Sequence, residues 1–318
     1  MLEKWKKAVI HLEAATDSVD SDHYAEKIKE LSKLLGEQKI TREQYDLAIS
    51  SGSRDIRYHG TAIFLAHEGR RYLLTARHVV WDELRAEREL EWVARLANAG
   101  NPHQRQQFLD HMLQAVDSKI FGIFFRVSSL DEILSQSPSK TPLMNLGVGP
   151  VKYHSYTFSD PKLDLAVISL DRNHTDFAED LLNRGYAPIS LDDIADGPDI
   201  EGQEIAAIGF PSATALIGYT GSDNTWGSNI YSLPISSFGR VSMLHPELDY
   251  FWADISIYPG NSGGAVIANN RLVGIVSAQA ILPIDSAPDV STRIPFGKII
   301  KAGYLRQLLE VQIAKDLL

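Results

Sequence analysis

Three short segments of the chain contain residue types that can perform nucleophilic catalysis. They are 74–79 (LTARHV), 163–167 (LDLAV) and 258–264 (YPGNSGG), and they carry His78, Asp164 and Ser262 in that order. A serine hydroxyl is a poor nucleophile at neutral pH, so Ser262 needs a general base, and an imidazole such as that of His78 titrates in the right range. A carboxylate at the other ring nitrogen orients the imidazole and stabilises its cationic form, which is the role expected of Asp164.

The order of the three segments is more informative than any one of them, because each alone is also typical of a strand end or a turn. The three residues lie far apart in the chain, so they can meet only in the tertiary fold. The order histidine, aspartate, serine is not that of subtilisin or of the α/β-hydrolases. A serine esterase of the hydrolase type would carry its serine in a Gly-x-Ser-x-Gly turn ahead of the histidine, whereas Ser262 comes last.

These motifs resemble those of the trypsin/chymotrypsin-like serine endopeptidases. The resemblance is strongest to the bacterial branch with HtrA-type and glutamyl-type enzymes, where Thr-Ala-x-His-Val and Gly-Asn-Ser-Gly-Gly are usual. It covers residues from about 8 to 300 apart from the helical segments, and no PDZ domain is evident. The resemblance implies a protein or peptide substrate and an acyl-enzyme on Ser262. It also implies that no cofactor and no metal is needed.

Further site residues carry over from the family by position. Gly260 and Ser262 match the positions whose backbone N–H groups form the oxyanion hole, where one donor is worth on the order of 3 kcal/mol. Ser277 matches the serine that pairs with the substrate backbone and supports the catalytic aspartate. Ser256 falls at the base of the specificity pocket, and Gln279 replaces a glycine in its wall. Because the residue at the bottom of the specificity pocket is not acidic, we expect cleavage after a small or medium uncharged residue.

Two residues depart from the family pattern. Arg77 replaces the small residue that commonly precedes the catalytic histidine, which is tolerated if its side chain points out of the barrel. Asn261 replaces an aspartate that pairs with a new N-terminal amine in members made as zymogens. An amide cannot form that ion pair, so we expect no activation by N-terminal clipping.

Short β-rich runs separated by turn residues predict the elements that position these residues. In the first half they are 60–66, 71–76, 120–127, 151–158 and 164–170. In the second half they are 203–210, 235–243, 250–256, 264–268, 272–278 and 291–296. With the resemblance, this pattern predicts an all-β fold of two antiparallel, chymotrypsin-like β-barrels with the site between them.

Helical periodicity interrupts the β pattern at three places. Residues 22–35 form an apolar repeat, and Thr41 is the expected N-cap of a short helix that follows. Residues 82–117 predict a helical hairpin inserted into the first barrel, and 298–318 predict an amphipathic closing helix. Residues 8–13 fit either a helix that begins at Trp5 or a short strand, and their β-branched side chains favour the strand.

The segment 171–199 is rich in loop residues and predicts the boundary between two domains. Residues 1–170 would form an N-terminal barrel that carries His78 and Asp164 together with helical insertions at about 22–49 and 82–117. Residues 171–318 would form a C-terminal barrel that carries Ser262 and the closing helix. We expect the insertions either to cover the barrel surface or to dock a regulatory protein partner.

Composition limits the remaining classes of function. The chain has 318 residues, 44% of them hydrophobic and 23% charged, and a net charge of −10, which disfavours a nucleic-acid partner. It contains no cysteine, so it has no disulfide, thiol nucleophile or Cys-based zinc site, which fits a reducing compartment. It contains no apolar run long enough for a secretory signal or a membrane span. We therefore expect a cytoplasmic protein without a membrane partner.

Other candidate sites are weaker. Four acidic residues at 171, 176, 179 and 180 lack the spacing of a Ca²⁺ loop, and His103 and His111 lack a third metal ligand. A catalytically idle trypsin-like domain that serves as a protein-binding module is the alternative function. The complete set of three catalytic residue types argues for the enzyme.

Overall fold

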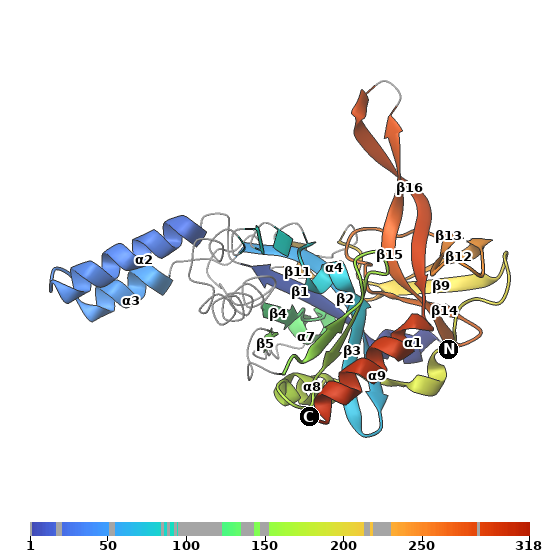
Figure 1. Cartoon of the computed structure of the whole chain (residues 1–318), viewed down its shortest axis with the longest axis horizontal. Helices are drawn as coiled ribbons and strands as arrows, with labels where there is room; N and C mark the ends of the chain where they lie inside the picture. Colours follow the sequence, from blue (N-terminus) through green and yellow to red (C-terminus); the bar gives the residue numbers. More distant parts are fainter. Residues whose placement is uncertain are drawn as a thin grey trace.

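The molecule consists mainly of β-strands, most of them in two large sheets (Figure 1). This computed structural model describes residues 2–16, 21–50, 55–83, 123–134, 143–146, 153–212, 217–218, 230–284 and 287–318, together with 86, 87, 90, 91 and 94. Within these ranges the predicted all-β class is confirmed, with one closed barrel and a C-terminal helix.

The first sheet has eight strands and is built around the first half of the chain. They are β1 (Val9–Thr16), β2 (Asp55–His67), β3 (Arg70–Ala76), β4 (Ile123–Arg126), β5 (Leu143–Asn145), β6 (Tyr156–Phe158), β7 (Leu165–Ser169) and β8 (Ile189–Ser190). Their order is β5-β4-β1-β2-β3-β7-β6, and all these pairs are antiparallel. Strand β8 pairs in parallel with β2. The described strands form an open path, with β5 and β6 at its two ends.

The second sheet closes into a six-stranded barrel of order β12-β13-β16-β15-β14-β9. Its strands are β9 (Glu204–Gly209), β12 (Ile235–Leu244), β13 (Tyr250–Asp254), β14 (Ala265–Ala268), β15 (Arg271–Ile284) and β16 (Ala287–Lys301). A separate short ladder joins β10 (Ile217–Gly218) to β11 (Ile230–Tyr231). Since β8 still belongs to the first sheet, the chain passes between sheets after Ser190. The domain division at 170/171 stays a prediction.

The structure contains the helices predicted over residues 22–35 and after Thr41, together with several that were not predicted. They are α1 (Leu2–Ala8), α2 (Ser21–Gly36), α3 (Arg42–Ser50), α4 (Arg77–Val80), α7 (Leu130–Leu134), α8 (Thr175–Asn183), α9 (Tyr304–Asp316) and the 3₁₀ turn η1 (Leu191–Asp193). Thr41 caps α3 as predicted, because its Oγ1 accepts the Gln44 N–H at 3.1 Å while the Gln44 side chain accepts the Thr41 N–H at 2.9 Å. In the predicted hairpin at 82–117, residues 83, 86, 87, 90, 91 and 94 are helical. Its second helix lies outside the described residues.

Helices α4 and α7 were not predicted, and three further segments differ from the sequence-based expectation. Helix α8 lies in the segment expected to be loop, because Phe177, Ala178 and Leu181 form a short buried face that its acidic residues obscure. The closing helix begins only at Tyr304, since residues 298–301 continue strand β16. The N-terminal segment contains both alternatives, with helix α1 before strand β1.

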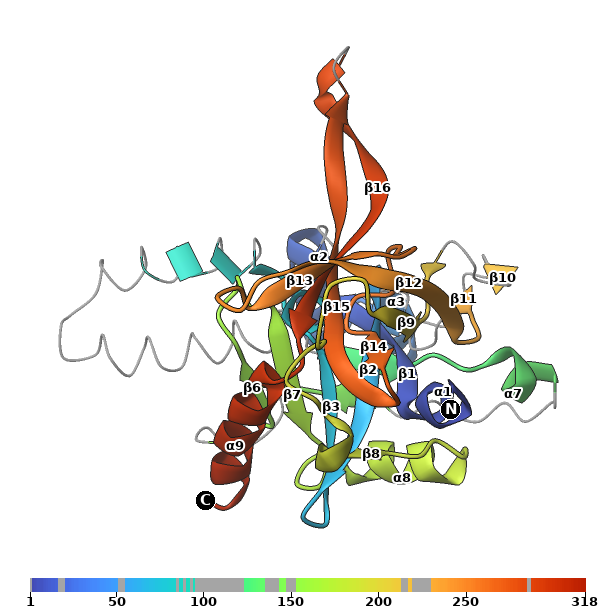
Figure 2. The same ribbon diagram turned by 90° about the vertical axis from the view of Figure 1, so that its right-hand side faces the viewer.

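One of the clusters of buried apolar residues spans the two sheets. It joins Ile63 and Leu65 of β2 to Ile208 and Ile275 of the barrel and to Leu305 of α9. Helix α9 follows the barrel strands in sequence but packs against β6 and β7 of the first sheet (Figure 2). Its contact includes two buried polar groups, because the Thr157 hydroxyl donates to the Gln312 side chain at 2.8 Å. The Ser169 hydroxyl also donates to Asp316 at 2.7 Å, so α9 ties the two halves together.

Candidate active site

A cleft of about 320 Å³ lies where the two sheets meet. Residues of both halves line it, and they include five of the predicted site residues: His78, Gly260, Ser262, Ser277 and Gln279. The lining residues are Tyr58, His59, His78, Val79, Ile257, Tyr258, Pro259, Gly260, Ser262, Ser277, Ala278, Gln279, Ile281 and Arg293. The structure therefore brings together residues that the chain separates widely.

His78 and Asp164 are neighbours because the strands beside them are paired. Strand β3 ends at Ala76 opposite Leu165, the first residue of β7, so His78 follows one strand as Asp164 precedes the other. His78 Nδ1 lies 2.8 Å from Asp164 Oδ2 and 3.0 Å from Oδ1, and the His78 backbone N–H donates to Oδ1 at 3.0 Å. These bonds hold the ring by Nδ1 and leave Nε2 to act as the base.

The Asp164 carboxylate is fixed by a second partner from the other half of the molecule. The Ser277 hydroxyl of β15 donates to Asp164 Oδ2 at 2.5 Å, which matches the support predicted for Ser277. The backbone of Asp164 has a φ of 51°, in the left-handed region that aspartate tolerates better than most residues. Its backbone carbonyl accepts the Arg77 N–H at 3.1 Å, so both its main chain and its side chain are held.

The Ser262 hydroxyl donates to the Ser277 carbonyl oxygen at 3.4 Å rather than to the His78 ring. His78 and Ser262 nevertheless line the same cleft, and the His78 side chain is 48% exposed on it. Catalytic hydrogen bonds are often loose in free enzymes and tighten when the substrate binds. Proton transfer from Ser262 to Nε2 therefore requires the hydroxyl to turn from Ser277 towards His78.

The segment around Ser262 presents two backbone donors to the cleft. Within the described part of the chain, the N–H groups of Gly260 and Ser262 donate to no protein acceptor. Gly260 has a φ of +95°, and a Cβ there would lie 2.3 Å from the carbonyl oxygen of Phe210. Only glycine fits this backbone path. The arrangement matches that of an oxyanion hole, in which preformed donors await a developing negative charge.

Thr61 of β2 holds the nucleophile segment onto the first sheet. Its backbone N–H donates to the Ser262 carbonyl at 2.8 Å, and its hydroxyl donates to the Gly260 carbonyl at 2.8 Å. The same hydroxyl accepts the Phe210 N–H at 3.1 Å. Thr61 was not predicted as a site residue. A threonine within the apolar run 60–66 was the available signal, since a buried hydroxyl needs partners.

The approach of the two halves at this point leaves no room for a side chain after the nucleophile. A Cβ on Gly263 would lie 2.0 Å from the Thr61 carbonyl oxygen and 2.2 Å from the Thr75 hydroxyl. Thr75 in turn donates its hydroxyl to that Thr61 carbonyl at 2.7 Å. The glycine of the predicted motif is therefore required by the contact between the two sheets and also by its φ of +83°.

The two departures from the family pattern have clear structural settings. The Arg77 side chain lies away from the cleft, where it donates to the Ser159 carbonyl and pairs with Glu83 at 2.7 Å. The Ser159 hydroxyl accepts the Leu165 N–H at 2.8 Å, so Arg77 braces the segment that carries Asp164. Asn261 is 5% exposed, and its side-chain oxygen has no hydrogen-bond partner among the described residues.

Of the two residues predicted to form the specificity pocket, Gln279 lines the cleft and Ser256 does not. Gln279 lines the cleft, and its amide donates to the Ile294 carbonyl at 3.1 Å, so it bridges β15 and β16 at the cleft wall. Ser256 is exposed and is not among the residues that line the cleft, whereas the adjacent Ile257 is. The role of Ser256 at the pocket base stays a prediction.

A buried pair of histidines lies beside the cleft, and sequence analysis did not identify it. His11 Nε2 lies 3.2 Å from His59 Nδ1, and the His11 ring stacks on Phe210 at 4.9 Å. His59 Nε2 lies 3.5 Å from the buried Glu13 carboxylate. Burial lowers the pKa of His59 to about 4, and burial together with His59 lowers the pKa of His11. Both rings are therefore neutral at pH 7.

Three of the four acidic residues considered for Ca²⁺ have arginine partners instead. Arg71 pairs with Asp171 and with Glu179, and Arg184 pairs with Asp180 at 2.7 Å. Within the described ranges no group of three or more acidic or histidine side chains is arranged to hold a metal ion, and no helix is long and apolar enough to cross a membrane. His103 and His111 lie outside the described residues.

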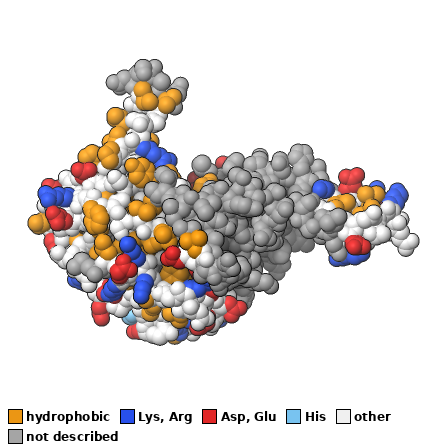
Figure 3. Space-filling model, turned by 180° about the vertical axis from the view of Figure 1, so that it is seen from behind, with side chains coloured by type: hydrophobic (Ala, Val, Ile, Leu, Met, Phe, Trp, Pro, Cys, Tyr) orange, Lys and Arg blue, Asp and Glu red, His pale blue; other side chains and the backbone are white. Residues whose placement is uncertain are grey.

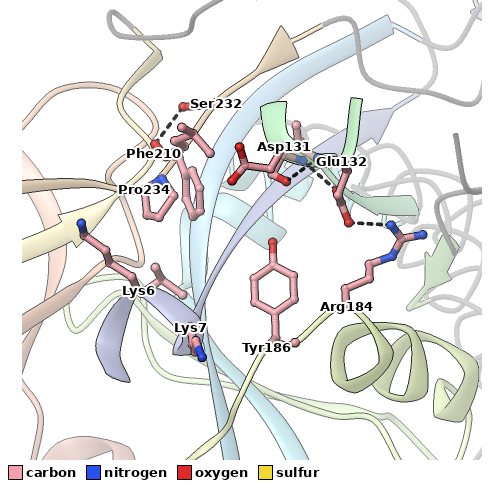
Figure 4. A pocket seen from close by; sticks show the side chains of 14 residues that line it. Lys6, Lys7, Asp131, Glu132, Arg184, Tyr186, Phe210, Ser232 and Pro234 are labelled. Atoms are coloured by element: carbon pink, nitrogen blue, oxygen red, sulfur yellow. Dashed lines mark hydrogen bonds and ion pairs between the residues drawn. The ribbon is translucent and has the colours of Figure 1, made fainter. Parts of the chain in front are cut away.

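A second pocket of about 440 Å³ is separate from the cleft (Figure 4). Phe210 forms part of its wall, and the backbone carbonyl oxygen of the same residue lies close to Gly260. Lys6 and Lys7 lie on one side, and the Glu132–Arg184 pair, at 2.5 Å, lies on the other. None of the predicted catalytic residues lines this pocket.

Comparison with known proteins places this site in context. The model of the trypsin-like peptidase domain matches residues 60–275. Serine protease PepD from Mycobacterium tuberculosis is 32% identical over 158 residues, which is 49% of this chain and 30% of that protein. A probable periplasmic serine endoprotease DegP-like from Pseudomonas fluorescens is 26% identical over 204 residues, 60% of this chain and 35% of that protein. The chain thus spans about a third of the length of these relatives.

Two crystal structures of Rv3671c from M. tuberculosis H37Rv, both of an inactive form, are similar to this chain at 13% sequence identity. Their TM-scores are 0.39 and 0.40. The alignments cover 98% and 97% of this chain and 90% of each of those chains.

Replacing Thr61 with valine tests the contact between the halves. Thr61→Val keeps the side-chain shape and the backbone N–H but removes the hydroxyl that bonds Gly260 and Phe210. We expect a loss of about 1–3 kcal/mol in the free energy of unfolding. We also expect a larger fall in kcat than rise in KM, because the oxyanion donors lose their fixed position. Urea unfolding and steady-state kinetics measure both, and an unchanged kcat would contradict the assigned role.

The buried histidines predict a loss of stability in mild acid. Burial lowers the pKa of His59 and of His174 to about 4, below the value near 6.5 of an unfolded chain. The unfolded chain therefore takes up protons first, so the free energy of unfolding should fall from about pH 6.5 down to about pH 4. His59→Gln and His174→Gln should each reduce the slope of the free energy of unfolding against pH by up to about 1.4 kcal/mol per pH unit. Urea unfolding across this range measures the slope, and parallel profiles for variant and wild type would refute the prediction.

Proposed function

The chain belongs to the trypsin-like peptidase family, and from this we propose that it acts as an intracellular serine endopeptidase on protein or peptide substrates. The observation that carries the proposal is the joint placement of His78, Ser262 and two free backbone N–H groups in one cleft, with Asp164 behind the histidine. A base, a nucleophile and an oxyanion site are the groups that acyl transfer requires.

In the proposed mechanism the Ser262 oxygen attacks the scissile carbonyl carbon while its proton moves to His78 Nε2. The carbonyl oxygen becomes an oxyanion, which accepts hydrogen bonds from the backbone N–H groups of Gly260 and Ser262. When the tetrahedral intermediate collapses, the carbon–nitrogen bond breaks and His78 gives its proton to the leaving amine. A water molecule then attacks the acyl ester on Ser262, with His78 again taking and returning the proton. Asp164 stabilises the imidazolium in both halves of the cycle.

Single and double substitutions test this mechanism. Ser262→Ala and His78→Ala should each lower kcat by several orders of magnitude, and the double variant should lose little more because the residues act as a unit. Asp164→Asn should lower kcat by about 10⁴-fold, since it favours the wrong ring tautomer. Peptide hydrolysis measures all three.

A fluorophosphonate probe separates the enzyme from the idle protein-binding module. The wild type should become labelled on Ser262, and Ser262→Ala should not. Absence of labelling in the folded wild type would favour the module. Inhibition by EDTA as strong as that by a serine-directed reagent would contradict a mechanism in which these side chains act without a metal.

The intracellular location is the part of the proposal that rests on composition, chiefly the absence of cysteine. One relative is named as periplasmic, so the periplasm is the competing location. Fractionation of cells that make the tagged protein distinguishes the two, and recovery with periplasmic markers would refute the intracellular location.

We also propose that the helical insertions dock a regulatory protein. Helices α2 and α3 stand away from the sheets in Figure 1, and the insertion at 82–117 directly follows α4, which carries His78. A partner that shifts this insertion would move the base. Replacement of residues 84–116 by a short linker should therefore change activity and partner recovery in lysate. A folded variant that matches the wild type in both would show that the insertion only covers the surface.

A further inference from the structure

Strands β15 and β16 extend beyond the barrel as a two-stranded arm. Figures 1 and 2 show the arm projecting away from the rest of the molecule. Strand β15 is buried from Leu272 to Val276 and exposed from Leu282 onward. Its outer residues pair with β16 alone among the described strands, with Ile281 opposite Arg293 and Leu282 opposite Thr292. The outer edge of β15 therefore has free backbone groups to which another extended chain can pair.

The arm carries large apolar side chains in contact with solvent (Figure 3). Ile281 is 66% exposed, Leu282 53% and Val290 51%, and Ile284 is also exposed. A lone two-stranded hairpin is marginally stable in water, and grouped exposed apolar residues mark interaction surfaces. The composition of the arm therefore fits a strand that is covered by another chain during function.

The arm is a continuation of the cleft wall. The Ser277 carbonyl lies 3.4 Å from the Ser262 hydroxyl, and the same strand then lines the cleft with Ala278, Gln279 and Ile281 before it leaves the barrel. Ile281 and Ile284 follow Ser277 by four and seven residues. At about 3.3 Å per residue, a chain lying beside Ser277 reaches the apolar part of the arm without a bend. The match to the family model ends at residue 275, before the arm begins.

We propose that the outer edge of β15 binds the polypeptide that is being cleaved, through an extended segment with large aliphatic side chains four to seven residues from the scissile bond. This inference rests on the proposed function and names the substrate class of the same site. Backbone pairing along β15 supplies affinity, and contacts with Leu282 and Ile284 supply the preference for apolar residues. A substrate already held in the cleft has a high effective concentration at the arm, which favours it over a second copy of the chain.

Peptides of two lengths test the proposal. A short fluorogenic peptide covers the cleft, and longer ones add eight residues on one or the other side of the scissile bond, rich either in Leu and Val or in Ser and Thr. For the wild type, the apolar extension on one side should raise kcat/KM about tenfold over the polar extension, mainly through KM. For a variant with both Leu282→Ser and Ile284→Ser, this ratio should fall to about one.

Phe238→Ser is the matched control, since it removes an apolar side chain of β12 that is 69% exposed and lies off the arm. This variant should keep the tenfold preference. Equal kcat/KM for apolar and polar extensions of the wild type, on both sides, would overturn the proposal while labelling of Ser262 and cleavage of the short peptide upheld the proposed function.

Binding to Ser262→Ala tests the arm without catalysis. A fluorescent apolar long peptide should bind this variant, and adding Leu282→Ser and Ile284→Ser should weaken binding about tenfold; equal affinity would overturn the proposal. Sedimentation velocity examines the competing occupant. If the two arm substitutions convert a dimer to a monomer and leave the peptide preference intact, the arm binds a second copy and the proposal is wrong.

Discussion

The hydrogen bonds of Thr61 are the interaction on which the geometry of the cleft depends. A single strand residue of the first sheet contacts both sides of the nucleophile segment, through its N–H at Ser262 and its hydroxyl at Gly260. Buried hydroxyl and amide groups are costly to leave unpaired, so this contact fixes the spacing of the two sheets within narrow limits. Gly263 is then the residue that lets the backbones approach so closely.

Ser277 forms a second contact between the two halves, which links Asp164 to Ser262. Ser277 donates its hydroxyl to Asp164 of the first half and accepts the hydroxyl of Ser262 with its carbonyl. One residue of β15 thus touches the acid and the nucleophile at once, and the same strand continues to the cleft wall and the arm. A polypeptide that pairs with β15 near the cleft lies against Ser277, the residue that holds the Asp164 carboxylate. Ser277 therefore supports both the position of the polypeptide and the position of this charge.

Much of this structure could be predicted from the sequence because its signals are local. The β-rich runs, the Thr41 cap and the motifs around His78, Asp164 and Ser262 depend on neighbouring residues, and each appears at the predicted place. The function of the site residues remains a prediction. Thr61 and the His11–His59 pair were missed because their partners lie far away in the chain. The arm was missed because its apolar residues resemble those of any buried strand, and sequence alone does not show which strands leave the core.

The place of helix α9 in the sequence affects the order in which the molecule folds during synthesis. It is the last element of the chain, yet Gln312 and Asp316 bond with Thr157 and Ser169 of the first sheet. During synthesis the first sheet emerges from the ribosome before α9, so its surface beneath this helix stays uncovered until Tyr304–Asp316 has been made. The polar contacts of α9 with the first sheet can form only then. They close the shared core over residues of both halves.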